Sequence, residues 1–406
     1  MQTNLVEWIA ETPEGREADA ILRKCVHCGF CTATCPTYQL LGDELDGPRG
    51  RIYLIKQVLE GKPATEATQL HLDRCLTCRN CETTCPSGVQ YGRLLDIGRD
   101  VVARQVERPA RDRLARSALK EGLTSHVFAP AMKLGQMVRP FLPTTLRNKV
   151  PRAQNAGKWP RRSHARKMLL LAGCVQPSMQ PNINAATARV LDALGIELIV
   201  PGAAGCCGAI RQHLDDHAGA AANMRANIDA WWPHVEAGAE AIVTNASGCG
   251  VLVKEYGHLL RNDWRYAEKA QRISELARDL VEILPPLLEP LKTRLWPSRG
   301  TRVAFHPPCT LQHGQKIRGQ VEALLQSLGA EVLPFNEGHF CCGSAGTYSV
   351  LQPELAYELR DRKLRNLHAA RPNVILSANI GCITHLQSGT EMVVEHWIEW
   401  VDRRLK

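Results

Sequence analysis

The residues of this chain with the clearest chemistry are its cysteines. Sixteen occur among 406 residues, and all of them fall into three groups. The first group consists of two runs with the spacing C-x2-C-x2-C-x3-C-P, formed by Cys25, Cys28, Cys31, Cys35 and Pro36 and by Cys75, Cys78, Cys81, Cys85 and Pro86. Such a paired run is typical of proteins that bind two [4Fe–4S] clusters. These eight residues therefore indicate one-electron redox chemistry.

The spacing also predicts which cysteines share a cluster. Three cysteines at three-residue intervals wrap a loop around one cluster, while the fourth starts the next helix and completes the other cluster. Zinc is the alternative, since C-x2-C pairs also bind zinc, but a zinc site needs two pairs and not a triplet. Three residues inside the loops, His27, Arg79 and Asn80, are expected at the surface. We predict one cluster on Cys25, Cys28, Cys31 and Cys85 and a second on Cys35, Cys75, Cys78 and Cys81.

The other eight cysteines belong to an internal repeat in residues 168–406. Each copy has a cysteine after a short apolar strand, a Cys-Cys-Gly triplet 32 residues later and a fourth cysteine after another strand. Strands of a parallel sheet present their carboxyl ends at one edge, so we expect each set to gather around one metal centre. A further iron–sulfur cluster, tetrahedral zinc, a vicinal redox disulfide and ordinary buried thiols remain open. The two sets are Cys174, Cys206, Cys207 and Cys249, and Cys309, Cys341, Cys342 and Cys382.

The elements around the cysteines predict an α/β protein. Residues 48–60 and about 91–106 have helical patterns in the first part of the chain. In the repeat, strands and helices alternate, which favours parallel sheets. The duplication indicates two copies of one α/β unit. We therefore predict a helical, ferredoxin-like domain with two [4Fe–4S] clusters at 1–110, a helical and basic linker at 111–167, and α/β domains at 168–295 and 296–406.

Charge and hydropathy indicate where the protein acts. The net charge is +9, and many bases lie in 147–167, including Arg147 and Lys149. We interpret this segment as a solvated connection in preference to a membrane-binding or partner-binding one. The N-terminal residues carry several carboxylates and do not resemble a signal peptide. No stretch reaches about 18 apolar residues. We expect a cytoplasmic protein, peripheral on the cytoplasmic face of the inner membrane, without a nucleic-acid partner.

The order of these motifs resembles a known family. The repeat is similar to the cysteine-rich "CCG" domain of heterodisulfide reductase subunits. The whole arrangement resembles the iron–sulfur subunits of glycolate oxidase, anaerobic glycerol-3-phosphate dehydrogenase and lactate-utilisation complexes. Longer strings favour the glycolate oxidase type, namely Cys25–Tyr38, Gly42–Tyr53, Cys75–Pro86 and Asn227–Pro233.

The chain departs from the fuller CCG pattern at one position in each copy. That pattern ends in C-x2-C, whereas here Leu252 follows Cys249 and His385 follows Cys382 at the third position. Each set thus has four thiolates instead of five, which puts the unusual clusters of the reductase family in doubt. His385 is a weak candidate for a substitute ligand, and a histidine satisfied by other partners is the preferred interpretation.

The resemblance implies electron transfer within an oxidoreductase complex. No G-x-G-x-x-G motif follows a strand, so no flavin or dinucleotide site of that type is expected on this chain. A flavin subunit would oxidise glycolate to glyoxylate, and this chain would pass the electrons towards the quinone pool. The alternatives are an equivalent lactate or glycerol-3-phosphate dehydrogenase subunit, a thiol–disulfide reductase that uses the CCG cysteines, and a metal-bound scaffold. The chain alone is not expected to act on the substrate.

Overall fold

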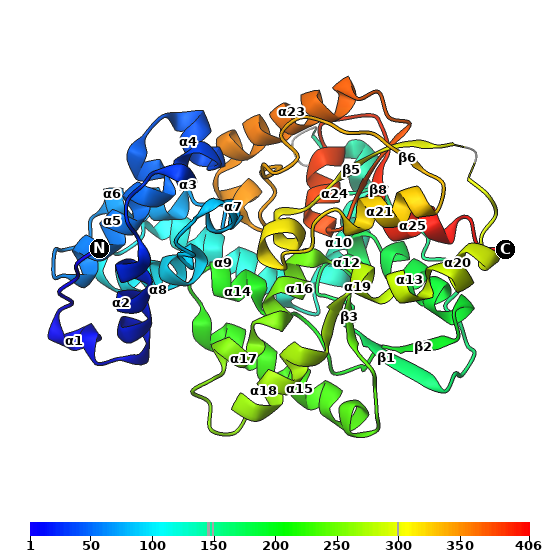
Figure 1. The fold of residues 1–406 in the computed structure, drawn as a ribbon, viewed down its shortest axis with the longest axis horizontal. Helices are drawn as coiled ribbons and strands as arrows, with labels where there is room; N and C mark the ends of the chain where they lie inside the picture. The colour runs from blue at the N-terminus through cyan, green and yellow to red at the C-terminus, as the bar shows by residue number, and fades with distance from the viewer. Residues whose placement is uncertain (144–146, 148–149, 299) are drawn as a thin grey trace. The chain divides into compact units, whose positions relative to one another are not determined.

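The computed structural model describes residues 1–143, 147, 150–298 and 300–406. The chain forms two compact units, the first made of Met1–Arg116 and His339–Lys363 and the second of Ser117–Gly338 and Leu364–Lys406. Figure 1 labels many of the helices and strands of both units. The domain boundaries expected from the sequence stay a prediction.

The first unit is helical in its described elements. Helices α5 and α8 confirm the two helices predicted from the apolar pattern. They pack together with α2 around a core that contains Leu22, Ile55 and Leu94. The elements are α1 (Glu7–Ala10), α2 (Pro13–Lys24), α3 (Phe30–Ala33), α4 (Pro36–Leu41), η1 (Glu44–Asp46), α5 (Pro48–Leu59), α6 (Glu66–Asp73), α7 (Asn80–Thr84), α8 (Tyr91–Gln105) and α22 (Tyr348–Leu351).

The second unit contains two four-stranded parallel sheets, which confirms the predicted fold class. The strand orders are β2-β1-β3-β4 and β6-β5-β7-β8, so the second sheet repeats the topology of the first. In both, the first strand of the repeat lies between the second and the third, and because these neighbours are parallel, crossover connections join them. The strands are β1 (Arg166–Leu170), β2 (Ile196–Ile199), β3 (Ile242–Thr244), β4 (Ala277–Asp279), β5 (Arg302–His306), β6 (Glu331–Val332), β7 (Val374–Ser377) and β8 (Val394–His396).

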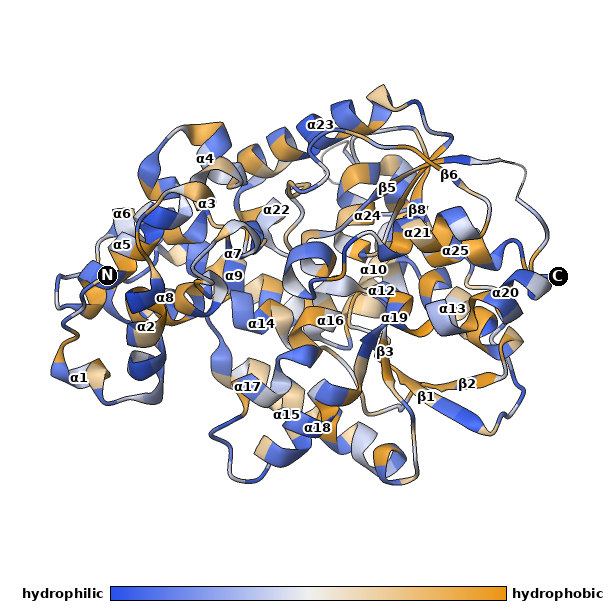
Figure 2. Cartoon of the chain, in the orientation of Figure 1, coloured by the Kyte–Doolittle hydropathy of each residue, from blue (hydrophilic) through white to orange (hydrophobic). Residues whose placement is uncertain are grey.

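Helices connect these strands and cover the sheets. Figure 2 shows bands of hydrophilic and hydrophobic residues along α23, the pattern of a helix with one buried face. Helices α9 (Ala110–Thr124) and α23 (Pro353–Ala369) each have residues in both units. The others are α12 (Gln176–Met179), α13 (Asn182–Ala193), α14 (Ala209–His213), α15 (His217–Glu236), α16 (Ser247–Lys254), α17 (Tyr256–Leu259), α18 (Ala267–Leu276), α19 (Leu280–Ile283), η3 (Pro285–Leu287), α20 (Leu288–Arg294), η4 (Thr310–Gly314), α21 (Gln320–Ser327), α24 (Ile380–Gln387) and α25 (Trp397–Asp402).

The predicted linker begins as helix and ends as irregular chain. Helix α10 (Phe128–Val138) and the turn η2 (Arg139–Phe141) follow α9 in this linker. Residues 151–164 form neither helix nor strand. Lys149 of the basic segment lies outside the described residues. No helix in the described ranges has both the length and the apolar character that crossing a bilayer requires.

Candidate metal centres

The two cysteine loops of the first unit have the same backbone conformation. In the first, His27 and Gly29 have left-handed φ values of 56° and 85°. In the second, Thr77 and Arg79, at the matching positions, have φ values of 51° and 58°. Left-handed residues inserted in a loop turn successive N–H groups to one side and create an anion-binding concavity. Thr77 N–H already donates to Cys75 Sγ at 3.5 Å. Both loops therefore fit a negatively charged cluster.

The first loop gathers four thiols. A cavity is lined by Cys25, Cys28, Cys31 and Cys85, with Cys81 also on its wall. Burial raises the pKa of Cys31 to about 11, and the nearby thiols of Cys25, Cys85 and Cys28 contribute to the rise. The cavity thus brings together the four cysteines predicted for the first cluster, including the distant Cys85, with Cys81 beside them. The division of ligands between the clusters stays a prediction.

The second loop gathers the other four thiols. Burial raises the pKa of Cys81 well above its usual value, and Cys78, Cys75 and Cys35 add to the rise. Tyr91 Oη donates to Cys75 Sγ at 3.7 Å. The donor set is four cysteine sulfurs with polar support, which suits an iron–sulfur cluster.

The local structure corrects two details predicted from the sequence. Cys35 is the N-cap of α4, as expected for a fourth cysteine that starts a helix. The same expectation is wrong for Cys85, which ends α7 as its C-cap. Asn80 is not at the surface, because only 2% of it is exposed. Its amide donates to Thr34 O at 2.9 Å and ties the second loop to the first.

A buried charge network adjoins the second group of thiols. Arg51 donates to Asp46 at 3.3 Å, and Arg74 donates to the other oxygen of Asp46 at 2.9 Å. Burial alone would lower the pKa of Arg51, but Cys75, Tyr91 and Cys35 raise it above its usual value. Asp43, Asp46 and His71 also lie close enough to hold a metal ion, but the two arginines already neutralise Asp46. We therefore assign no metal ion to the group formed by Asp43, Asp46 and His71.

The first set of repeat cysteines meets at the carboxyl ends of strands. Cys174 follows β1, the pair Cys206 and Cys207 follows β2, and Cys249 lies in α16 after β3. The pKa of Cys206 is lowered to about 3, because the thiols of Cys174 and Cys207 donate to its sulfur. The pKa of Cys207 is raised through its contacts with Cys206 and Cys249. Contacts link all four thiols, and the negative charge of the group is concentrated on Cys206. Four sulfur atoms gathered in this way are a donor set that can bind a metal cation.

The glycine of each Cys-Cys-Gly triplet has the expected turning role. Gly208 has a φ of 98° and Gly343 a φ of 89°, values that favour glycine. A Cβ on Gly343 would lie 2.3 Å from the backbone oxygen of Ala356. Gly208 N–H donates to Cys206 Sγ at 3.4 Å, and Gly343 N–H donates to Cys341 Sγ at the same distance.

The second set of repeat cysteines is divided between the two units. Cys309 and Cys382 belong to the second unit, and Cys341 and Cys342 belong to the first. All four are buried, as is His385. The corresponding residue of the first repeat, Leu252, is buried in an apolar core.

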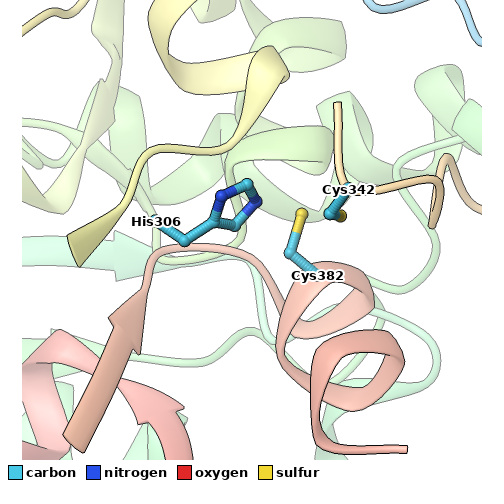
Figure 3. A group of neighbouring side chains, drawn as sticks. All are labelled: His306, Cys342 and Cys382. Carbon is cyan, nitrogen blue, oxygen red and sulfur yellow. The ribbon is translucent and has the colours of Figure 1, made fainter. Parts of the chain in front are cut away.

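Sequence reasoning missed one histidine of the second unit. His306, the last residue of β5, has a ring nitrogen within 4.8 Å of Cys382 Sγ. Figure 3 shows the ring turned towards that sulfur. The sequence does contain one signal. His306 precedes Cys309 by three residues, whereas a leucine, Leu171, precedes Cys174 by three residues in the first repeat.

Comparisons with known families agree with this division of the cysteines. Residues 21–89 match the family described as 4Fe-4S dicluster domain. Residues 168–254 and 303–387 each match the family described as cysteine-rich domain, CCG. The matches include all sixteen cysteines.

Whole-chain comparisons give three informative relatives. The glycolate oxidase iron–sulfur subunit of Escherichia coli is 55% identical over 408 residues, with all of both chains covered. The probable glycolate oxidase iron–sulfur subunit of Bacillus subtilis is 29% identical and covers 91% of this chain and 89% of its own length. Lactate utilization protein A of Geobacillus thermodenitrificans is 28% identical, with 54% of this chain and 90% of its own length covered.

Proposed function

Because the chain belongs to the family of glycolate oxidase iron–sulfur subunits, we propose that it is the electron-transfer subunit of a glycolate-oxidising complex. The observation that carries the proposal is the full-length identity of 55% to the Escherichia coli subunit. The two gathered sets of N-terminal thiols support it, because they fit the required redox centres. A partner subunit with a flavin oxidises glycolate to glyoxylate, and this chain carries the electrons towards the quinone pool.

Two [4Fe–4S] clusters are proposed in the first unit. Such a cluster accepts and releases single electrons when bound. The proposed ligand sets are Cys25, Cys28, Cys31 and Cys85 for one cluster and Cys35, Cys75, Cys78 and Cys81 for the other. The support is that Cys85 lies close enough to Cys31 to raise the pKa of that thiol. In the same way, Cys35 raises the pKa of Cys81. The chain's own role is to hold the thiolates and to point N–H groups at the bound anion.

Each cysteine-rich domain is proposed to hold a further metal centre, either an iron–sulfur cluster or zinc. In the first domain the support is the contact of four thiols that come from separate strand ends. In the second it is the duplicated spacing and the shared family. The proposed ligands are Cys174, Cys206, Cys207 and Cys249, and Cys309, Cys341, Cys342 and Cys382.

The complex is proposed to lie on the cytoplasmic face of the inner membrane through its partners, and the basic segment 147–167 is compatible with an anionic surface nearby. Lysine and arginine side chains near an anionic surface contribute about 1 kcal/mol each. A high-salt wash should therefore release the complex. Extraction that requires detergent would contradict this mode of attachment.

The decisive test of the function is deletion and complementation. Membranes from cells without this chain should lose glycolate-dependent reduction of a dye or quinone. Lactate-dependent and glycerol-3-phosphate-dependent reduction should persist, which controls for general damage to the membrane. The full chain should restore activity, and a chain with Cys31→Ala and Cys81→Ala should not.

Two outcomes would reassign the protein. Loss of lactate oxidation with intact glycolate oxidation would place it with the lactate-utilisation relatives. Thiol-dependent disulfide reduction by the purified chain, with glycolate oxidation unaffected by its deletion, would favour the thiol–disulfide reductase alternative.

A further inference from the structure

His306 distinguishes the second cysteine-rich repeat from the first. It ends β5 and precedes Cys309 by three residues, whereas Leu171 stands at the matching distance before Cys174. Both side chains are buried, with exposures of 0% for His306 and 3% for Leu171. An imidazole thus occupies a place in the fold that an aliphatic side chain fills in the other copy. A buried imidazole is stabilised by polar neighbours, and the sulfur of Cys382 is one of the atoms near this ring.

The sheet register brings His306 close to Cys382. In the parallel pair of β5 and β7, His306 lies opposite Ser377, whose hydroxyl donates to the backbone oxygen of His306 at 2.9 Å. Five residues after Ser377, Cys382 lies in the first turn of α24. The two side chains therefore approach each other from neighbouring strand ends (Figure 3).

The separation of the two side chains suits a shared metal ion. A ring nitrogen of His306 and the sulfur of Cys382 lie within 4.8 Å of each other. Bonds of about 2.1 Å to nitrogen and 2.3 Å to sulfur at a tetrahedral ion place the two ligand atoms roughly 3.5 Å apart. The structure places the two ligand atoms no more than 4.8 Å apart, which is compatible with that separation. One ion can therefore bind both side chains.

Asn379 also contacts the sulfur of Cys382. Its amide nitrogen donates to Cys382 Sγ at 3.7 Å, and its amide oxygen accepts from Gly248 N–H at 3.2 Å. A hydrogen bond to the sulfur favours the thiolate form that metals bind. The hydrogen bond from Asn379 therefore supports Cys382 as a metal ligand.

We propose that His306 is the nitrogen ligand of the metal centre in the second cysteine-rich domain, next to the thiolate of Cys382. The inference rests on the metal centre proposed above for Cys309, Cys341, Cys342 and Cys382. His306, and not His385, is then the histidine that binds the metal. Imidazole and thiolate ligands together suit zinc or iron and not magnesium or calcium. The first centre, with Leu171 at the matching place, has thiolates only.

The test is the coordination of the metal in the full chain. The complex with its flavin partner would be purified anaerobically, and its zinc and iron contents measured. X-ray absorption at the zinc edge and pulsed EPR for nitrogen coupled to iron would then be recorded. The informative variant is His306→Leu, which installs the residue that the first repeat tolerates. His306→Cys, His385→Ala and Leu171→Ala are the matched variants.

The proposal expects an imidazole signal in the natural protein that disappears in His306→Leu together with the metal of that centre. His306→Cys should retain the metal with sulfur ligands only, and His385→Ala and Leu171→Ala should leave the imidazole signal unchanged. An imidazole signal that survives in His306→Leu, or is lost in His385→Ala, would overturn the assignment of His306 and leave the centre standing. A natural protein with no metal beyond its two [4Fe–4S] clusters would overturn both the centre and its ligand. Glycolate-dependent electron transfer, measured separately, reports on the proposed function.

Discussion

Arg51 donates a hydrogen bond to Asp46 where both side chains are 1% exposed. The guanidinium also donates to His71 O at 2.7 Å and to Thr37 Oγ1 at 3.1 Å. Cys75 and Cys35, two proposed ligands of the second cluster, are among the groups that raise the pKa of Arg51. A buried cation in this position stabilises the more negative, reduced form of the cluster. Arg51 is therefore expected to set the potential of the second cluster.

Arg51→Met should lower the reduction potential of the second cluster. Loss of the cation makes an added electron less stable, and the shift should be roughly 60 mV or more, which for one electron is a tenfold change in equilibrium. EPR-monitored redox titration of the full chain measures the shift. The first cluster serves as an internal reference.

Three variants separate the charge of Arg51 from its packing. Arg51→Lys keeps the charge and should keep a potential near the natural value. Asp46→Asn removes the opposing charge and should raise the potential. Arg104→Met removes a cation from an exposed ion pair on α8 and should change nothing. Equal shifts in Arg51→Met and Arg51→Lys would show that packing, and not charge, is responsible.

Cys35→Ala should damage the cluster held by Cys75, Cys78 and Cys81, because it is proposed to complete that cluster. About four irons should be lost, the content of one cluster. The EPR spectrum that remains should match that of Cys81→Ala and differ from that of Cys31→Ala. A match to Cys31→Ala would place Cys35 on the other cluster and refute the crossed ligand sets.

The loop around the first cluster is the expected docking surface for the flavin subunit. Cys28 is exposed, and it lies between Val26 at 68% and Phe30 at 60% exposure. Exposed apolar side chains beside a proposed ligand suit a redox partner that must approach the cluster closely. Phe30→Glu should weaken binding of the flavin subunit roughly tenfold, which corresponds to about 1.4 kcal/mol.

The control for this surface is Trp264→Glu, which changes an aromatic residue of the second unit that is 88% exposed. It should leave the affinity for the flavin subunit unchanged. Binding is measured by titration with the purified partner, and the iron content must stay at the natural level in both variants. Unaltered affinity in Phe30→Glu would move the docking surface elsewhere.

The sequence predicted the parts of this protein that depend on local spacing. Three-residue intervals between cysteines dictate loops, and the alternation of strands with helices dictates parallel sheets. It did not reveal His306 beside Cys382, because that contact depends on which residues of β5 and β7 lie opposite each other. It placed Asn80 at the surface because its contact with Thr34 spans 46 residues. Arg51 was equally hidden, since its partners lie on separate elements.

Asp279 is expected to make the stability of the second unit depend on pH. It lies at the end of β4 with 2% exposure, and it accepts from Val281 N–H at 3.2 Å and from Gln315 at 3.3 Å. Burial raises the pKa of Asp279 from 3.8 to about 7, although Lys254 opposes the rise. The folded chain therefore keeps a proton that the unfolded chain releases above about pH 4.

The sign of the effect follows from that difference in bound protons. Between about pH 4 and 7 the folded state binds more protons than the unfolded state, so the free energy of unfolding falls as the pH rises. The total loss is at most about 4 kcal/mol, since each pKa unit corresponds to 1.36 kcal/mol.

Asp279→Asn keeps a neutral, N-capping side chain at the start of α19 and should not lose this stability. Its apparent Tm should exceed that of the natural protein at pH 8 and approach it at pH 5, as measured anaerobically by circular dichroism. Asp263→Asn, at a carboxylate whose pKa is lowered by Arg225, should behave like the natural protein across this range. Parallel Tm profiles for Asp279→Asn and the natural protein would mean that Asp279 does not hold its proton in the folded chain.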